Sequence, residues 1–264
     1  MEQTQTPVIL QCEGPIARLT FNRPDVLNAF NRECAIALLE ACRAIRNNSE
    51  VRVVLMRGNG NAFMAGGDVA TFQVSPTEAP ALFRSMLDPF HDAIEVMMAL
   101  NQPVVAAVHG AVAGGGLSLA LAADLIIAAD NTKFTMGYTK LGLSADGSGS
   151  WSLPRLVGLR RALEMALLSD IYGADDALRF GLVNRVVPAA TLAAETETLA
   201  NRLAEGPTVA LGHMKRLMRQ SFERSLNDQL DAEREALVTC ALTNDFREGV
   251  GAFFSRKSPS FSGK

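Results

Sequence analysis

Apolar and polar residues alternate along the first half of the chain in a way that predicts short strands separated by turns and helices. Runs rich in Val, Ile and Leu that are bounded by Gly, Pro or Asn are typical of strands. Between two of these runs, residues 32–47 place apolar side chains at helical spacing and predict an amphipathic helix. The predicted strands are Val8–Gln11, Ile16–Phe21, Val51–Arg57, Val104–Val108 and Leu125–Ala128.

The pattern changes near residue 190. Beyond it the spacing of apolar residues is helical throughout, and the predicted helices are 191–205, 208–224, 226–242 and 245–254. The repeated strand and helix units before this point predict an α/β core of stacked layers. We therefore divide the chain into a core, residues 1–190, and a helical segment, residues 191–264. The helical segment either packs on the core or contacts another copy.

Composition and charge narrow the class of protein. Hydrophobic residues make up 48% of the 264 positions, which is enough to fill a core. A formal net charge of −3 and an isoelectric point near 5.7 give no general attraction for nucleic acid or an acidic membrane. The apolar stretches are shorter than the roughly 20 residues of a membrane span, and the first residues do not resemble a signal peptide. We expect a cytoplasmic protein with no nucleic-acid or membrane partner.

The cysteines give no sign of a metal site or a disulfide framework. No C-x-x-C spacing is present, and the residues lie in apolar or helical surroundings, which is typical of reduced thiols. No metal or redox cofactor is therefore expected. The four cysteines are Cys12, Cys34, Cys42 and Cys240.

The first segment with candidate chemistry is NAFMAGGDVAT, residues 61–71. Gly66 and Gly67 allow the backbone to turn sharply and leave a backbone N–H unobstructed by a side chain. Asp68 suits the N-cap of a following helix. Taken alone, the segment is explained equally well as a tight turn with a cap.

The second segment is VHGAVAGGGLSLALAAD, residues 108–124, in which a predicted strand meets three glycines and then a helix. Backbone N–H groups at a helix N-terminus attract anions. The contiguous glycines and the absence of a following Lys-Ser or Lys-Thr exclude a P-loop and a Rossmann fingerprint. Close packing of helix on sheet would also explain the glycines. If the two segments converge, however, two exposed N–H groups would form an oxyanion hole of the kind that an enolate needs.

Four ordered motifs across almost the whole chain resemble the crotonase family of enoyl-CoA hydratases and isomerases. The resemblance implies a spiral of ββα turns with a C-terminal helical trimerisation segment. It also implies an oxyanion hole for a CoA thioester, formed by the backbone N–H groups of Gly67 and Gly115, with no cofactor besides the CoA of the substrate. The motifs are NRPDVLNAF (22–30), AFMAGGD (62–68), HGAVAGGGLSLALAAD (109–124) and FTMGYTKLGLSADGSGSWSLPRLVG (134–158).

The chain departs from the hydratases of this family at two positions. Those hydratases use a pair of glutamates, and the matching positions here hold Ser118 and Tyr138. Neither hydroxyl has a pKa low enough to act as an unaided base near neutral pH. Efficient hydration of a 2-enoyl-CoA is therefore not expected, although an enoyl-CoA hydratase that works with other residues stays an alternative.

Asp146, in LGLSADGSGSWSLPR, is the candidate acid and base. An aspartate in a turn commonly forms an Asx-turn or a cap. However, the chain resembles most closely the ring-epoxide and enoyl-CoA isomerases of phenylacetate breakdown, which carry an aspartate at this position. One carboxylate can move a proton between C4 and C2, and burial would raise its pKa and make it a better base. The predicted reaction converts a 3-enoyl-CoA to a 2-enoyl-CoA, or isomerises a ring-epoxide CoA ester.

Two further alternatives stay open. The 4-chlorobenzoyl-CoA dehalogenases of the same family carry a nucleophilic aspartate at the Asp146 position and a histidine at the spacing of His91. In those enzymes, however, a tryptophan stands at the position of Tyr138 and a bulky residue at that of Gly67. His91 is also explained as a helix-surface or core histidine, and His109 as a structural one. The alternative from another class is a non-catalytic acyl-CoA-binding protein, for which changing Asp146 would leave function intact.

The resemblance also implies which residues contact the acyl-CoA ester. One loop is expected to contact the nucleotide, and residues near the C-terminus are expected to close the CoA site of a neighbouring subunit, which implies a homotrimer or a dimer of trimers. The segment 69–86 is expected to line the acyl pocket through Phe72, Leu82, Phe83 and Met86. The predicted binding residues are Arg23, Leu27 and Ala29 in the nucleotide loop, then Ala65, Gly66, Asp68, Val69, Tyr138 and Leu143, and finally Phe253 and Arg256 from the neighbour.

Overall fold

The computed structural model describes residues 6–264, and its central element is a six-stranded sheet in the order β1-β2-β3-β4-β6-β9. The first two strands form an antiparallel hairpin, and every later neighbour pairs in parallel. Parallel neighbours need crossover connections, and helices provide most of these. The strands are β1 (Val8–Glu13), β2 (Ile16–Phe21), β3 (Val53–Gly58), β4 (Val104–Val108), β6 (Leu125–Ala129) and β9 (Arg185–Val187).

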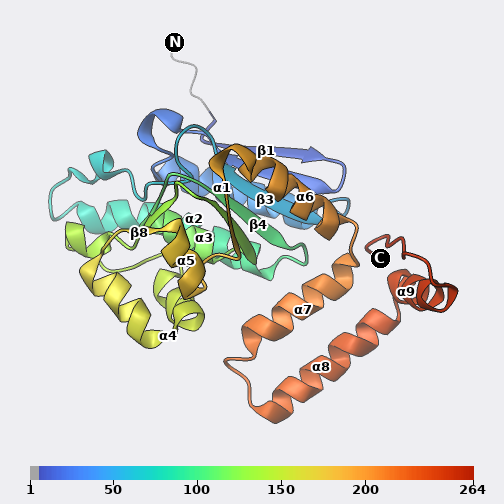
Figure 1. Cartoon of the computed structure of the whole chain (residues 1–264). Helices are drawn as coiled ribbons and strands as arrows, with labels where there is room; N and C mark the ends of the chain where they lie inside the picture. The colour runs from blue at the N-terminus through green and yellow to red at the C-terminus, as the bar shows by residue number, and fades with distance from the viewer. Residues whose placement is uncertain (1–5) are drawn as a thin grey trace.

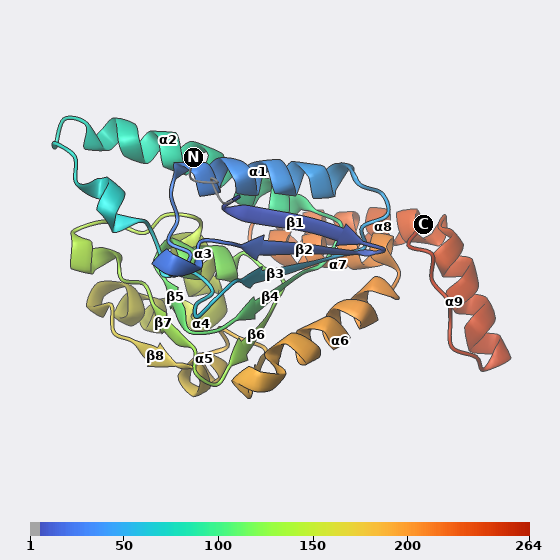
Figure 2. The same ribbon diagram turned by 90° about the horizontal axis from the view of Figure 1, so that it is seen from above.

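Both faces of this sheet are covered, which explains why its central strands are apolar at consecutive positions. In β3, Val54 and Met56 belong to the large core under α1 and α2, whereas Val53 and Leu55 pack with α6 on the other face. Figure 2 shows α1 and α2 on one side of the sheet and α6 on the other. The three helices are α1 (Arg32–Asn47), α2 (Ala79–Ala99) and α6 (Leu192–Ala204).

A second, three-stranded sheet in the order β5-β7-β8 brings two of the sequence motifs together. β5 and β7 are parallel, so the loops that follow them leave the sheet at the same edge. The elements of this region are β5 (Ala111–Ala113), β7 (Lys133–Thr135), β8 (Tyr172–Gly173), α3 (Gly115–Leu121), α4 (Gly149–Leu168) and α5 (Ala174–Phe180). Single helical turns are η1 (Pro24–Val26), η2 (Val69–Phe72), η3 (Tyr138–Leu141) and η4 (Ala189–Thr191).

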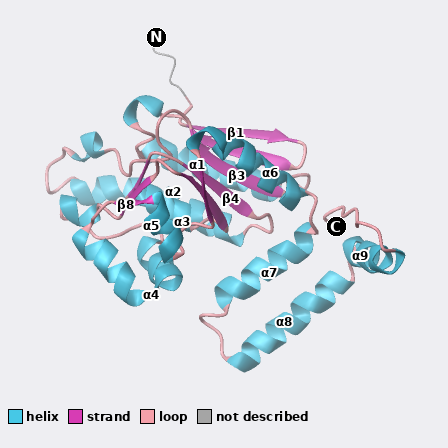
Figure 3. Cartoon of the chain, in the orientation of Figure 1, coloured by secondary structure: helices cyan, strands magenta, loops and turns pink. Residues whose placement is uncertain are grey.

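The last three helices lie away from the sheet, as Figures 1 and 3 show at the lower right. They are α7 (Thr208–Gln220), α8 (Leu226–Ala241) and α9 (Asn244–Ser255). Asp124, just before β6, forms salt bridges with Lys215 and Arg219 of α7 at 2.7 and 2.8 Å. These salt bridges connect α7 to the core. The division of the chain at residue 190 stays a prediction. The first helix after that point, α6, packs on the sheet, whereas α7–α9 lie away from it.

The predicted α/β class is confirmed, and most predicted elements are present. The helix 32–47 and the strands of β2 and β4 have the predicted bounds. The helix predicted over 208–224 ends at Gln220, because Ser225 caps the next helix by accepting the N–H of Asp228 at 3.2 Å. Among residues 6–264, no helix combines the length and the apolar character that crossing a membrane requires.

Candidate active site

The two glycine-containing segments lie side by side. Met64 of the first segment donates its N–H to Ala111 at 3.1 Å and accepts the N–H of Ala113 at 3.0 Å. On its other side the first segment pairs with the stretch that precedes α1, since the N–H of Phe30 donates to the carbonyl of Gly66 at 2.7 Å. Backbone pairing therefore produces the convergence that the sequence motifs suggested.

The N–H groups of Gly67 and Gly115 are free to bind a ligand. Gly115 is the first residue of α3, so its N–H has no preceding helical turn to donate to. Within residues 6–264, neither N–H donates to a protein acceptor. Both glycines line the same cavity. Two backbone N–H groups beside one cavity therefore lack a protein acceptor, and their oxyanion role stays a prediction.

The glycine run also serves packing. A Cβ atom added to Gly116 would lie 2.4 Å from the carbonyl oxygen of Met64, so α3 touches the first segment at backbone distance. Gly66 has φ of +101°, a conformation that favours glycine. The packing explanation considered for the glycines therefore holds at Gly116, the neighbour of the cavity-lining Gly115.

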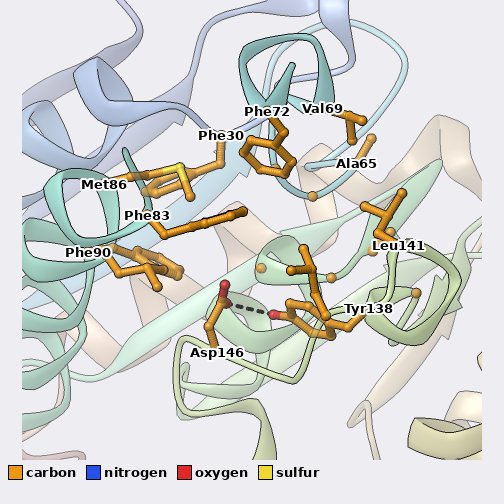
Figure 4. Close-up of a pocket in the computed structure, with 18 residues that line it drawn as sticks. Phe30, Ala65, Val69, Phe72, Phe83, Met86, Phe90, Tyr138, Leu141 and Asp146 are labelled. Carbon is orange, nitrogen blue, oxygen red and sulfur yellow. Dashed lines mark hydrogen bonds between the residues drawn. The ribbon is translucent and has the colours of Figure 1, made fainter. Parts of the chain in front are cut away.

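The cavity beside the two segments has a volume of about 110 Å³ and a largely apolar wall. Figure 4 shows Phe30, Phe72, Phe83, Phe90 and Met86 gathered opposite Asp146 and Tyr138. The segment 69–86 thus lines it as predicted, with one exception. Leu82 does not line the cavity, because the α2 face toward it carries Phe83, Met86, Leu87 and Phe90, at helical spacing.

Asp146 is the one carboxylate among the residues that line this cavity in the described chain. Its Oδ1 accepts a hydrogen bond from the Tyr138 hydroxyl at 2.7 Å. Burial raises the pKa of the Asp146 carboxyl, while the hydrogen bond from Tyr138 and the nearby His91 oppose that rise. The direction agrees with the pKa shift expected from the sequence and suits a base in an apolar site.

Ser118 and Tyr138, the two residues that the resemblance aligned with glutamates, lie next to each other behind Asp146. Ser118 Oγ is 3.0 Å from the Tyr138 hydroxyl, and both residues are buried. Burial and the charge of Asp146 raise the pKa of the Tyr138 phenol well above its usual range. Tyr138 is therefore a protonated donor, and neither residue adds a carboxylate to the site.

The three histidines have different surroundings, and two of them matter here. His91 lies exposed on α2, and its Nε2 accepts the N–H of Gly147 at 3.4 Å. The sequence allowed a helix-surface histidine but did not indicate this contact with the turn that carries Asp146. His109 Nε2 is 2.9 Å from the carbonyl oxygen of Gly60, which agrees with its structural interpretation.

Asp68 occupies the N-cap position of η2, as the sequence predicted, but the predicted side-chain cap is absent. Its side chain makes no capping bond to η2, because it pairs with the Arg23 guanidinium at 2.9 Å. Arg23 also donates to the carbonyl of Ala29, and the carbonyl of Leu27 accepts the N–H of Ala65 at 3.0 Å. The predicted nucleotide loop therefore lies against the first glycine-containing segment, and it borders the cavity without lining it.

The predicted binding residues fall into three groups. Ala65, Gly66, Val69, Tyr138 and Leu143 line the cavity. Arg23, Leu27, Ala29 and Asp68 form the neighbouring loop contacts, and Phe253 and Arg256 lie at the end of α9, outside the cavity of their own chain. The Phe253 side chain is 79% exposed. Their predicted role needs a second copy of the chain and stays a prediction.

Comparison with known proteins covers nearly the whole chain. The enoyl-CoA hydratase/isomerase family model matches residues 11–264. The chain is 38% identical to 1,2-epoxyphenylacetyl-CoA isomerase of Escherichia coli strain K12, over 97% of this chain and 98% of that protein. It is 32% identical to crotonyl-CoA hydratase of Syntrophomonas wolfei, with 97% and 98% covered. An enoyl-CoA hydratase crystal structure from Polaromonas sp. JS666 matches with a TM-score of 0.91 at 35% identity, with 96% and 99% covered. The chain therefore belongs to the enoyl-CoA hydratase/isomerase, or crotonase, family.

Proposed function

We propose that the protein is an acyl-CoA isomerase that shifts the double bond of a 3-enoyl-CoA to the 2-position, or that rearranges a ring-epoxide CoA ester. The observation that carries this proposal is that Asp146 is the single carboxylate among the described residues that line the cavity. Ser118 and Tyr138, which the resemblance places at the family's two glutamate positions, bring only hydroxyl groups. Relatives named as isomerases and as hydratases are both similar to this chain, so the site chemistry has to distinguish the two reactions.

In the proposed reaction the thioester oxygen accepts hydrogen bonds from the N–H groups of Gly67 and Gly115. Asp146 removes a proton from C2, and the electron pair of the C2–H bond is shared with the C3–C4 double bond and the thioester carbonyl in a dienolate. The carboxylic acid then returns the proton to C4, which leaves the double bond between C2 and C3 and restores the carboxylate. A donor in an oxyanion hole typically lowers the barrier by about 3 kcal/mol.

Hydration needs more than this site offers. A water molecule must lose a proton to a base while an acid protonates the α-carbon, and one carboxylate cannot be in both protonation states at once. Tyr138 does not replace the base because its pKa is raised well above the usual range. We therefore expect isomerisation to be much faster than hydration.

The test is a kinetic assay of the purified protein with a 3-enoyl-CoA and, separately, with a 2-enoyl-CoA. We expect rapid isomerisation and little hydration, and a kcat that falls roughly 10²- to 10⁴-fold in Asp146→Asn while acyl-CoA binding persists. Asp231→Asn, an exposed carboxylate on α8, is the matched control and retains activity. Normal turnover in Asp146→Asn would exclude the assignment and favour a binding role, and efficient hydration would favour the hydratase alternative.

We also propose that the C-terminal helices mediate a homotrimer or a dimer of trimers, in which Phe253 and Arg256 close the CoA site of a neighbouring copy. This is supported by large apolar side chains that are exposed on α8 and α9, among them Leu237 at 74%, Phe253 at 79% and Phe254 at 81%. Exposed apolar surface of this kind is typical of interaction sites.

A further inference from the structure

Two hydroxyl groups continue from Asp146 into the core as a chain of hydrogen bonds. Tyr138 lies 2.7 Å from Asp146 Oδ1, and Ser118 Oγ lies 3.0 Å from the Tyr138 oxygen. An ionised carboxylate only accepts, so the single hydroxyl proton of Tyr138 is directed to Asp146. Ser118 must then donate to the Tyr138 oxygen. The chain has one direction, from Ser118 through Tyr138 to Asp146.

The surrounding structure is shaped to hold this pair of hydroxyl groups. Ser118 is fully buried and Tyr138 is 8% exposed, so water competes little for their hydrogen bonds. The turn that carries Asp146 passes very close to Ser118, because a Cβ atom added to Gly149 would lie 2.4 Å from Ser118 Oγ. The glycine in the turn thus leaves room for the hydroxyl group.

The two oxygens of Asp146 differ in their surroundings. Oδ1 accepts from Tyr138, whereas no donor within residues 6–264 bonds Oδ2. Oδ2 is also not sealed inside the protein, since the one buried side-chain polar atom without a partner in the described chain is Arg155 Nε. Because Asp146 lines the cavity, its free oxygen is the one available to substrate.

We propose that Tyr138 and Ser118 are positioning residues, which hold Asp146 so that Oδ1 stays an acceptor throughout turnover and Oδ2 alone carries the proton between C4 and C2. This inference rests on the proposed isomerase function. When the C2–H bond breaks, the proton joins Oδ2 and the electron pair of that bond enters the dienolate. Oδ1 becomes the carbonyl oxygen of the acid and still accepts from Tyr138. Transfer of the proton from Oδ2 to C4 restores the carboxylate, so no other proton donor is needed.

The pH dependence of kcat reports on this arrangement. The active base is the ionised carboxylate, so kcat rises with pH through the pKa of Asp146 and then levels off. Tyr138 and His91 are the ionisable groups in the described chain that affect the pKa of Asp146, and both lower it. Phe90 and Gly115, which also lie against this turn, carry no charge. Removing the Tyr138 hydroxyl therefore raises the pKa and moves the acidic limb to higher pH.

The experiment compares Tyr138→Phe with Tyr172→Phe, using pH profiles of kcat for isomerisation of a 3-enoyl-CoA. Tyr172 is the other tyrosine of the chain and packs on Phe180 outside the cavity, so its variant is a matched control with an unchanged profile. In Tyr138→Phe we expect the acidic limb to shift upward by about one pH unit, since a hydrogen bond to a charged group is lost. We also expect kcat at the plateau to fall roughly 10-fold because the carboxylate is free to rotate. Binding of a saturated acyl-CoA changes little.

Two more variants make the result specific. Ser118→Ala shifts the limb in the same direction by a smaller amount, and it carries the test alone if Tyr138→Phe fails to fold. In a His91→Gln background, the shift caused by Tyr138→Phe persists. A wild-type limb and plateau in Tyr138→Phe, together with an inactive Asp146→Asn, would overturn the positioning role and leave the isomerase function standing. An active Asp146→Asn would overturn the proposed function itself.

Discussion

The region around the cavity is tightly packed within the chain, whereas the helices α7–α9 leave large apolar side chains exposed. Near the cavity, backbone packs on backbone, and a methyl group at Gly116 would lie 2.4 Å from the Met64 carbonyl oxygen. On α9, by contrast, a Cβ atom at Gly251 would meet nothing within 4 Å, and Phe253 and Phe254 are 79% and 81% exposed. One region is completed within the chain, whereas the other presents apolar surface to its surroundings.

This difference teaches where sequence change is tolerated and why. The two N–H donors and the carboxylate of the proposed site must keep fixed positions. Dense packing within one chain holds them there, because the neighbouring atoms have no room to shift. A surface that meets another molecule needs only exposed apolar area of the right shape. Substitutions of the same chemical kind are therefore expected to act very differently in the two regions.

The largest effect is expected from replacing glycine by alanine at Gly116. The added methyl group collides with the carbonyl oxygen and the side chain of Met64, in the segment that leads to Gly67. We expect the free energy of unfolding to fall by about 3 kcal/mol, as for other overpacked sites. Isomerase activity falls as well, since α3 and the first segment are pushed apart. Urea denaturation and the enoyl-CoA assay measure the two effects.

Gly251→Ala is the matched control for this substitution. Gly251 lies inside α9 with open space around it and ordinary helical geometry. Alanine stabilises a helix interior relative to glycine by about 0.5–1 kcal/mol. The two variants are therefore predicted to change stability with opposite signs. Equal destabilisation by both would mean that the contrast between the regions is wrong.

The next effect is expected at the joint between the regions. Asp124 accepts from Lys215 and Arg219 of α7 and, through Oδ2, from the N–H of Val104 at 2.8 Å. Asp124→Asn removes the charge while Lys215, whose side chain is 9% exposed, remains buried. We expect a loss of about 2 kcal/mol, the range for hydrogen bonds to a charged group. Hydrogen exchange in α7 is expected to rise before exchange in the sheet does.

Asp231→Asn tests whether any lost ion pair has this effect. Asp231 and its partner Arg234 are both more than half exposed, and exposed pairs contribute little to stability. Its unfolding curve is expected to match that of the unaltered protein. If Asp124→Asn also unfolds like the unaltered protein, the salt bridges of Asp124 do not hold α7 on the core.

Much of the fold could be read from the sequence because its signals are local. The helix 32–47 and the strand 104–108 have the predicted bounds, since each apolar pattern matches one element and polar or turn residues bound it. One local prediction that failed is the side-chain cap by Asp68, although Asp68 does occupy the N-cap position. It failed because Arg23, distant in the sequence, is brought within 2.9 Å and pairs with the carboxylate.

The sequence identified which segments form the candidate site, but it did not predict how their side chains contact one another. The glycine pairs and Asp146 stood out because unusual residues in turns invite a chemical explanation. The hydrogen bonds from Ser118 to Tyr138 and on to Asp146 could not be read, since they join three elements across the fold. The sequence showed two missing glutamates, and it did not show that the hydroxyl groups at those positions support the remaining carboxylate.

The smallest effect on the stability of a single chain is expected from Phe254→Ser on α9. Its side chain is 81% exposed, so the chain alone loses little packing and its free energy of unfolding changes by less than about 0.5 kcal/mol. If α7–α9 mediate the proposed assembly, the variant instead sediments as a smaller species, and its thermal stability becomes more dependent on protein concentration. Leu159→Gln on α4, 64% exposed outside the C-terminal helices, is the control and keeps the mass of the unaltered protein. If the assembly of Phe254→Ser kept its mass while that of Leu159→Gln became smaller, the assembly surface would lie on α4. The proposal that α7–α9 mediate assembly would then be wrong.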